Sequence, residues 1–549
     1  MTRRNWLLPA AFVFVYLAAC LAFTRVWQVT HDEGITWLQA FGALPLPRWP
    51  DAPVAMAELL PRLTGQGPGG WPDVLAALRG REGMHPPAYY LLLKSWAGLF
   101  GAGPFAMVVP PMLWGVGSLF GMRRLAERVA GGPAAGIWAM GLLAVSPWFL
   151  DFSLLSRPYS LALFLGLAGT NAVFDVAEST GRSRVRAAGV YALISILGLY
   201  VLYHYAFVLV WHFAWLALIA WGRGRSRGRE LGCLAGLAVV VGLGFAPWLT
   251  HLLAHLERTG AQGLYFAGAL APAEWPGAAL QVLALFGLAE AAQTESGPLL
   301  VAALAGLAAV SLPLVVSSFA LRRPEAPPPR SVVLFWISVP LLPLSIGIAD
   351  TLHDTHTLFL TKTGFLMLPL LIALVVRGWL RADFGVWVPR AGLAAWLLLF
   401  ATASVADFRG LSAHESPAET AARMIAADDD RRHLVVLASA TPGDAIPLLL
   451  SMQRIGVRQV DVAYTNELRL RKLVESPETR ARYRNLTLVN FVATDPRFQW
   501  PERRLERLRG EARAAGWHVS GDPAADTGRQ TEPASLRILG PLSPKFRSM

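Results

Sequence analysis

Charged residues are scarce in this chain of 549 residues. Asp, Glu, Lys and Arg together make up 16% of it, whereas about a quarter is usual in soluble proteins. Apolar residue types make up 54%, and the mean hydropathy is +0.43. These values exclude a disordered, a collagenous or an ordinary soluble chain, and they predict a protein that crosses a membrane several times.

Cysteine and lysine are also rare. The two cysteines, Cys20 and Cys233, lie in apolar runs, which excludes a disulfide framework and favours small packing residues. Only 4 of the 49 basic residues are lysines. The soluble C-terminal part, residues 406–549, contains no glycine-rich phosphate-binding motif and no Walker sequence, so no nucleotide is assigned to it. The sequence shows no internal repeat of fixed period.

Eleven segments are long and apolar enough to be predicted as membrane-spanning helices. Their approximate ranges are 6–24, 105–121, 133–150, 159–176, 189–203, 206–221, 231–249, 298–320, 331–349, 358–376 and 391–405. The charge-free stretch 189–221 is divided at Tyr203-His204-Tyr205, because its two Arg-rich flanks have to lie on the same side. Gly101 and Pro104 end a helix at 86–99, which we expect to lie along the membrane surface.

Two alternatives concern the first segment. Leu17-Ala18-Ala19-Cys20 matches a bacterial lipobox, and an arginine pair precedes the apolar run, as in a signal peptide. A first membrane-spanning helix that happens to contain a cysteine is favoured, because apolar residues continue past Cys20.

Arginine is distributed asymmetrically along the chain. With the N-terminus inside, eighteen arginines fall in inside segments, whereas the short outside turns hold only Arg157 and Arg258. Such an excess sets the orientation of membrane proteins. The net charge of +12 therefore reflects topology, and nucleic acid is not an expected partner.

The predicted topology divides the chain into two domains. Residues 1–405 form a transmembrane domain, with a large first outer loop at 25–104. Residues 406–549 have a soluble composition and form a small outer α/β domain. Its predicted strands are 434–437, 460–463, 486–492 and 536–539, and its predicted helices are 445–453, 466–474 and 501–514.

Acids, bases and cations are predicted at the outer ends of the spans. These groups are Thr30-His31-Asp32-Glu33, His85 to Tyr90, Ser156-Arg157-Pro158-Tyr159, Tyr203-His204-Tyr205, and His353-Asp354-Thr355-His356 with Lys362. Each group can also be explained without a function. Acidic residues at a membrane interface are usually just solvated, and long basic side chains extend to the interface. Two histidines three residues apart are a weak metal signal. Because all five groups face one side, they predict a functional site.

A carboxylate with several cations suits one reaction at the membrane surface. A sugar carried on a lipid phosphate lies at this depth, and arginine or lysine stabilises the phosphate that leaves. Phosphate leaves without being protonated first, so two paired carboxylates are not required. One carboxylate is enough as the general base toward an acceptor hydroxyl.

At these residues the chain resembles the GT-C glycosyltransferases, in the branch of the protein O-mannosyltransferases and bacterial lipid A aminoarabinose transferases. His31-Asp32-Glu33 is similar to the acidic motif of their first outer loop. The run from His85-Pro86-Pro87 to Leu93 is similar to their His-Pro-Pro segment. Ser156-Arg157-Pro158-Tyr159 and Tyr203-His204-Tyr205 resemble two shorter elements. The likeness covers the first ten spans and implies a GT-C fold, here an α-helical polytopic membrane protein of about eleven transmembrane helices.

The resemblance implies a bacterial inner-membrane glycosyltransferase that faces the periplasm, uses a polyprenyl-phosphate sugar and inverts the anomeric carbon. Asp32 is the predicted general base, and Glu33 binds or orients the acceptor. The residues predicted to bind the donor phosphate are Arg157, Lys362, His204 and His85. The other predicted substrate contacts are Tyr89, Tyr159, His353 and His356.

The chain departs from the family pattern at two places. Lys362-Thr363-Gly364 stands where the family often has Arg-Tyr, and lysine keeps the charge without the two-donor fork. The first loop has no Asp-x-Asp, so no metal or other cofactor is assigned, although a divalent metal is compatible with the reaction. The acceptor is a lipid-linked glycan, a cell-wall polymer or a protein.

Two other classes of function remain open. A flippase or transporter of a lipid-linked intermediate would use the same cations, but it predicts inverted repeats and polar groups near the bilayer midplane. A non-catalytic membrane scaffold for the outer domain would make Asp32 dispensable. The polar groups lie at one end of the predicted spans, which favours the enzyme.

Overall fold

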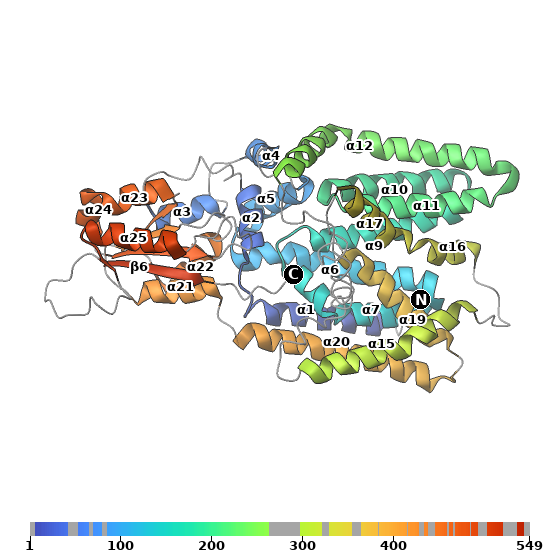
Figure 1. Cartoon of the computed structure of the whole chain (residues 1–549). Helices are drawn as coiled ribbons and strands as arrows, with labels where there is room; N and C mark the ends of the chain where they lie inside the picture. Colours follow the sequence, from blue (N-terminus) through green and yellow to red (C-terminus); the bar gives the residue numbers. More distant parts are fainter. Residues whose placement is uncertain are drawn as a thin grey trace.

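The protein consists of a bundle of long apolar helices with a smaller helix-and-sheet domain at one end (Figure 1). This computed structural model describes residues 6–41, 53–64, 70–79, 85–262, 297–320, 329–353, 364–382, 384–413, 416–427, 433–437, 445–457, 460–464, 467–483, 485–491, 502–519 and 535–542. The predicted class, a helical polytopic membrane protein with a small C-terminal α/β domain, is confirmed.

The helices of the first outer loop and of the bundle account for most of the described chain. They are α1 (Leu7–Phe23), α2 (His31–Ala40), α3 (Met56–Leu63), α4 (Trp71–Arg79), α5 (Ala88–Phe100), α6 (Pro104–Ala126), η3 (Glu127–Gly131), α7 (Pro133–Ala144), α8 (Pro147–Leu154), α9 (Tyr159–Glu178), α10 (Gly181–Val201), α11 (Tyr205–Trp221), η4 (Gly224–Ser226), α12 (Arg227–Gln262), α15 (Gly297–Ala320), α16 (Arg330–Ser338), α17 (Leu341–His353), η7 (Phe365–Met367), α19 (Leu368–Arg381) and α20 (Trp387–Ala413).

Seven helical segments of the described chain are long and apolar enough to cross a membrane, or eight if the bent pair α7–α8 is one span. The helices α1 and α11 are apolar but shorter, at 17 residues each. Ten of the eleven predicted spans fall on these helices or on the pair. The tenth predicted span, 358–376, begins outside the described residues and continues on η7 and α19.

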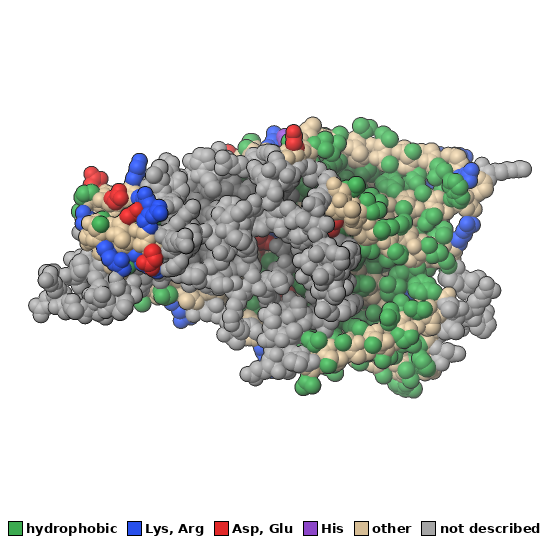
Figure 2. Space-filling view, in the orientation of Figure 1, with side chains coloured by type: hydrophobic (Ala, Val, Ile, Leu, Met, Phe, Trp, Pro, Cys, Tyr) green, Lys and Arg blue, Asp and Glu red, His purple; other side chains and the backbone are tan. Residues whose placement is uncertain are grey.

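The outer surface of the bundle is apolar. Figure 2 shows hydrophobic side chains over the helices, with basic side chains at the end far from the sheet domain. Leu7, Val185 and Leu299 are 68%, 74% and 79% exposed. Apolar surface of this extent on long helices is expected only where lipid is the solvent.

Glycine and proline set the breaks between the outer helices. Helix α5 ends at Phe100, and Gly101 follows with φ +85°, a conformation that favours glycine. Helix α6 begins at Pro104, in the first-turn position where its missing N–H costs nothing. The predicted separation of the surface helix from the span is therefore present, as is the predicted turn between α10 and α11.

The third predicted span is not straight. Helices α7 and α8 meet at an angle of 61°. Pro147 begins α8, and the preceding Ser146 is extended, as expected of a residue before proline. After the bend, α8 ends at Leu154, and the turn of residues 155–158 connects it to α9.

The C-terminal domain is built on a six-stranded sheet in the order β1-β3-β2-β4-β6-β5. Its elements are α21 (Pro417–Ala426), β2 (His433–Leu437), α22 (Ala445–Ile455), β3 (Val460–Tyr464), α23 (Glu467–Glu475), α24 (Pro477–Arg482), β4 (Asn485–Phe491), α25 (Glu502–Ala514), β5 (His518–Val519) and β6 (Ser535–Leu542). These five strands are parallel. Each predicted strand and helix of this domain coincides with one of these elements to within one residue at the overhanging end.

The sixth strand comes from elsewhere in the chain. It is β1 (Val54–Ala55) of the first outer loop, which pairs antiparallel with β3. The predicted domain boundary at residue 405 falls inside α20, which continues to Ala413.

Candidate active site

A capping box fixes the acidic motif at the start of α2. The hydroxyl of Thr30 accepts a hydrogen bond from the Glu33 backbone N–H (3.3 Å), and the Thr30 N–H donates to Glu33 Oε2 (2.9 Å). This reciprocal cap satisfies two free N–H groups, and the helix dipole favours acidic residues there. Asp32 and Glu33 are thereby held in the first helical turn.

Glu33 also ties α2 to the turn before α9. Its Oε1 accepts from the Ser156 N–H (2.9 Å) and from the Ser156 hydroxyl (3.0 Å). The indole of Trp37 donates to the same hydroxyl oxygen (2.8 Å). Glu33 is 1% exposed. With both oxygens engaged by the protein, Glu33 is suited to position its neighbours.

The Glu33 side chain meets only donors in these contacts. Burial raises the pKa of its carboxyl, and the hydrogen bonds from Ser156 and Thr30 oppose that rise. One backbone N–H donates to each carboxyl oxygen, and the Thr30 and Ser156 hydroxyls contact the same two oxygens. The two N–H donors favour the ionised form, in opposition to the effect of burial.

Arg157 lies against the backbone and side chains of α2. Its Nη1 donates to the Asp32 carbonyl (3.1 Å) and to the Thr36 hydroxyl (3.0 Å), and its Nη2 to the Tyr159 hydroxyl (3.4 Å). Nη2 also lies 3.9 Å from Asp32 Oδ2. The Arg157 side chain is 7% exposed and that of Asp32 is 37% exposed. A fixed cation thus stands beside an accessible carboxylate.

The start of α5 completes this side of the site. Helix α5 packs against α2, and the buried Tyr89 lies within electrostatic reach of Glu33 and Arg157. The His85 ring is 5.9 Å from that of Tyr90. The structure thus brings the acidic motif, the Arg157 turn and the His-Pro-Pro segment together.

The structure describes the contacts of the remaining predicted site residues only in part. Burial lowers the pKa of the His204 imidazole, and the carboxylate of Asp350 in α17 opposes that change. The ring of His204 is 6.2 Å from that of Phe207. Lys362 and His356 lie outside the described residues, as does the side chain of His353.

The sequence analysis did not identify Thr36 and Trp37 of α2. The Thr36 hydroxyl accepts a hydrogen bond from Arg157, and the Trp37 indole donates one to Ser156. Thr36 is one helical turn after Asp32, and this spacing was a usable signal. It also missed His212, which is fully buried inside the bundle between Thr170 (3.0 Å) and Tyr191 (3.3 Å). Both ring nitrogens have protein partners, so His212 ties α11 to α9 and α10.

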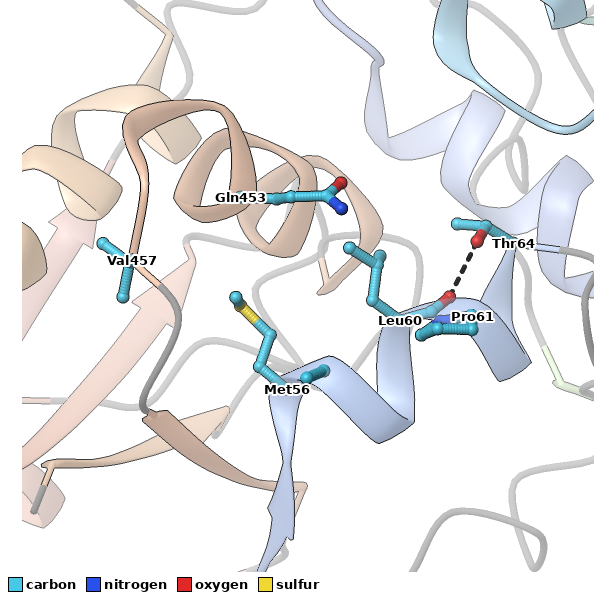
Figure 3. A pocket seen from close by; sticks show the side chains of 7 residues that line it. Met56, Leu60, Pro61, Thr64, Gln453 and Val457 are labelled. Carbon is cyan, nitrogen blue, oxygen red and sulfur yellow. Dashed lines mark hydrogen bonds between the residues drawn. The ribbon is translucent and has the colours of Figure 1, made fainter.

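The described part of the chain contains no cluster of metal ligands, but it contains a pocket in which Asp32 and Arg157 take no part. No group of three or more His, Cys, Asp or Glu side chains is placed there to hold a metal ion. A pocket of about 410 Å³ lies between α3 and the end of α22 (Figure 3). Its lining, which holds no acid or base, is Met56, Ala57, Leu60, Pro61, Thr64, Gln453 and Val457.

Comparisons with known proteins find only distant likenesses. No known family and no curated protein matches the sequence. The crystal structure of ArnT from Cupriavidus metallidurans bound to undecaprenyl phosphate is similar at 14% identity and a TM-score of 0.47, covering 87% of this chain and 94% of that one. Its apo form is similar at 12% identity and a TM-score of 0.40, covering 86% and 94%. At these scores the site residues themselves have to carry a functional assignment.

Replacing Glu33 with glutamine should lower the stability of the folded protein, although the two side chains have nearly the same shape. The amide NH2 would face either the two donors of Ser156 or those of Thr30. Buried donors left unpaired cost about 1–3 kcal/mol each. We expect a lower melting temperature in detergent, and an unchanged melting temperature would show that this network contributes little.

Proposed function

We propose that this protein is a glycosyltransferase that moves a sugar from a polyprenyl phosphate to a hydroxyl of a cell-envelope acceptor. The observation that carries the proposal is the pair of Asp32 and Arg157, an accessible carboxylate beside a buried and immobilised guanidinium. The family resemblance of the motifs that meet here supports the same reaction.

In the proposed reaction the acceptor oxygen attacks the anomeric carbon from the face opposite the phosphate. The new C–O bond forms as the bond from the sugar to the phosphate oxygen breaks, so the configuration inverts. Asp32 takes the proton of the acceptor hydroxyl, and the departing phosphate keeps the electron pair. Arg157 stabilises that negative charge, and Glu33 keeps α2 and the Arg157 turn in register.

A transporter has less support from the described residues. It would need polar groups within the spans that bind the substrate. His212 is a polar residue buried within the span α11. Its two nitrogens, however, already contact Thr170 and Tyr191.

The direct test is transfer from a panel of purified polyprenyl-phosphate sugars to cell-envelope fractions, using detergent-purified protein. Wild-type protein should label one acceptor class, and Asp32→Asn protein should not. Absence of transfer with every donor, alongside uptake or flipping of a lipid-linked sugar in vesicles, would favour the transporter.

The orientation of the protein is a separate prediction. The arginine asymmetry places the α/β domain and the site in the periplasm. A reporter fused within α20, which continues to Ala413, would remove the α/β domain. We therefore place the reporter after Met549. Alkaline phosphatase there should be active and β-galactosidase inactive, and the opposite pattern would reverse the topology.

A further inference from the structure

The C-terminal domain shares its core with the loop that carries Asp32. Side chains alternate along β2, so Val435 and Leu437 face one side of the sheet while Leu434 and Val436 face the other. The first side belongs to a core that continues into the outer loop and the bundle, including Trp37 of α2. The second side forms a separate core under α23 and α25.

Several contacts join the domain to the outer loop. Strand β1 extends the sheet through Val54 and Ala55, helix α3 packs on α22, and α2 itself contacts α22. In Figure 1, α2 and α3 lie between the sheet domain and the bundle. The α/β domain is thus completed by the segment that positions the acidic motif.

One polar contact reaches almost to the motif. Gln28 precedes the Thr30 cap by two residues, and its Nε2 donates to Glu419 Oε2 of α21 (2.6 Å). Arg454 of α22 pairs with the same oxygen (2.5 Å), and Arg423 pairs with Oε1 (3.3 Å). The Glu419 side chain is 13% exposed. The Glu419 carboxylate is therefore shared between Gln28 and two exposed arginines, Arg454 (54% exposed) and Arg423 (64% exposed).

We propose that the α/β domain positions the catalytic loop, with Glu419 fixing Gln28 and thereby the direction in which Asp32 presents its carboxylate. This inference rests on the proposed transferase function. Glu419 and Gln28 are positioning residues, because they act on the reaction through α2. A shift of about 1 Å at reacting groups can cost roughly 100-fold in rate. Because Gln28 is two residues from the Thr30 cap, losing its contact with Glu419 should lower kcat by moving Asp32.

An exchange of the two side chains tests the proposal. Gln28→Glu removes the donor amide and places a second carboxylate against that of Glu419. Adding Glu419→Gln restores one amide and one carboxylate with the roles reversed, so that one carboxylate remains beside Arg454 and Arg423. We expect Gln28→Glu to lower kcat by about 10- to 100-fold with little change in donor KM, and the double variant to recover most of the loss. The matched control is Glu511→Ala, which breaks the pair with Arg471 (2.9 Å) between α23 and α25, on the opposite face of the sheet.

Hydrogen exchange separates this inference from the enzyme assignment. The amides of residues 31–40 should exchange faster in Gln28→Glu protein and return to the wild-type rate in the double variant, whatever reaction the protein catalyses. Unchanged exchange there, or wild-type kcat in Gln28→Glu protein, would overturn the positioning role. If wild-type protein transfers no sugar but exchange responds as expected, the contact stands and the proposed function fails.

Discussion

Replacing Asp32 with asparagine should remove sugar transfer while leaving the protein folded. Asparagine keeps the shape of the side chain but cannot take the proton of the acceptor, and loss of a positioned base typically costs about 10²- to 10⁴-fold in rate. The side chain is 37% exposed and 3.9 Å from Arg157, and such partly exposed pairs contribute little to stability. Initial transfer rates and thermal melting on the same preparation measure both effects.

Asp73→Asn is the matched control for Asp32→Asn. Asp73 lies in the same outer loop and also in the first turn of a helix, α4, where its carboxylate accepts from the Gly70 N–H (2.8 Å). Asp73→Asn protein should transfer at the wild-type rate. Wild-type transfer by Asp32→Asn protein would exclude Asp32 as the base.

Arg157→Lys should insert normally and transfer poorly. The guanidinium reaches the Asp32 carbonyl, Thr36 and Tyr159 at once, whereas the single lysine nitrogen cannot reproduce that fork. Losing a charged hydrogen bond costs about 1.5–3 kcal/mol, or roughly 10- to 100-fold in rate. Because the charge on the phosphate grows as the sugar leaves, kcat should fall and not donor affinity alone.

Donor-saturation kinetics on purified protein test this expectation. Arg124→Lys is the control, since Arg124 pairs with Asp175 (2.9 Å) outside the site and is 56% exposed. An arginine that only anchors the chain at the interface would tolerate lysine. Wild-type turnover by Arg157→Ala protein would make Arg157 such an anchor and leave the donor phosphate without its main ligand.

Most of the helices and strands that build the two domains could be read from local sequence, but the predicted elements did not include α2, α3, α4, α21, α24, β1 and β5. A helix in lipid has to satisfy all its backbone groups internally, so an apolar run of sufficient length predicts a helix without knowledge of its neighbours. The break at Gly101 and Pro104 was equally local, whereas the break at His204 was placed from the arginine-rich flanks of the stretch 189–221. In the C-terminal domain, short apolar strands alternating with helical patterns were enough to predict elements such as β2 and α22.

The sequence also indicated the charged residues of the candidate site, but it assigned Asp32 and Glu33 different roles only through the family resemblance. Asp32 and Glu33 are adjacent in sequence and alike in chemistry. Their environments differ only because the turn 155–158 packs against α2. Ser156 donates two hydrogen bonds to Glu33, whereas the Asp32 side chain stays 37% exposed.

What the sequence determined by itself was thus the identity of the helices, the strands and the charged motifs, because these depend on residues close together in the chain. The tertiary structure decided the contacts across long separations: Glu33 with Ser156, Gln28 with Glu419, and β1 with β3. A single sequence carries no signal for such pairs, because a carboxylate or an edge strand can be satisfied by many partners. The bundle and the sheet select one of them by bringing it within hydrogen-bonding distance.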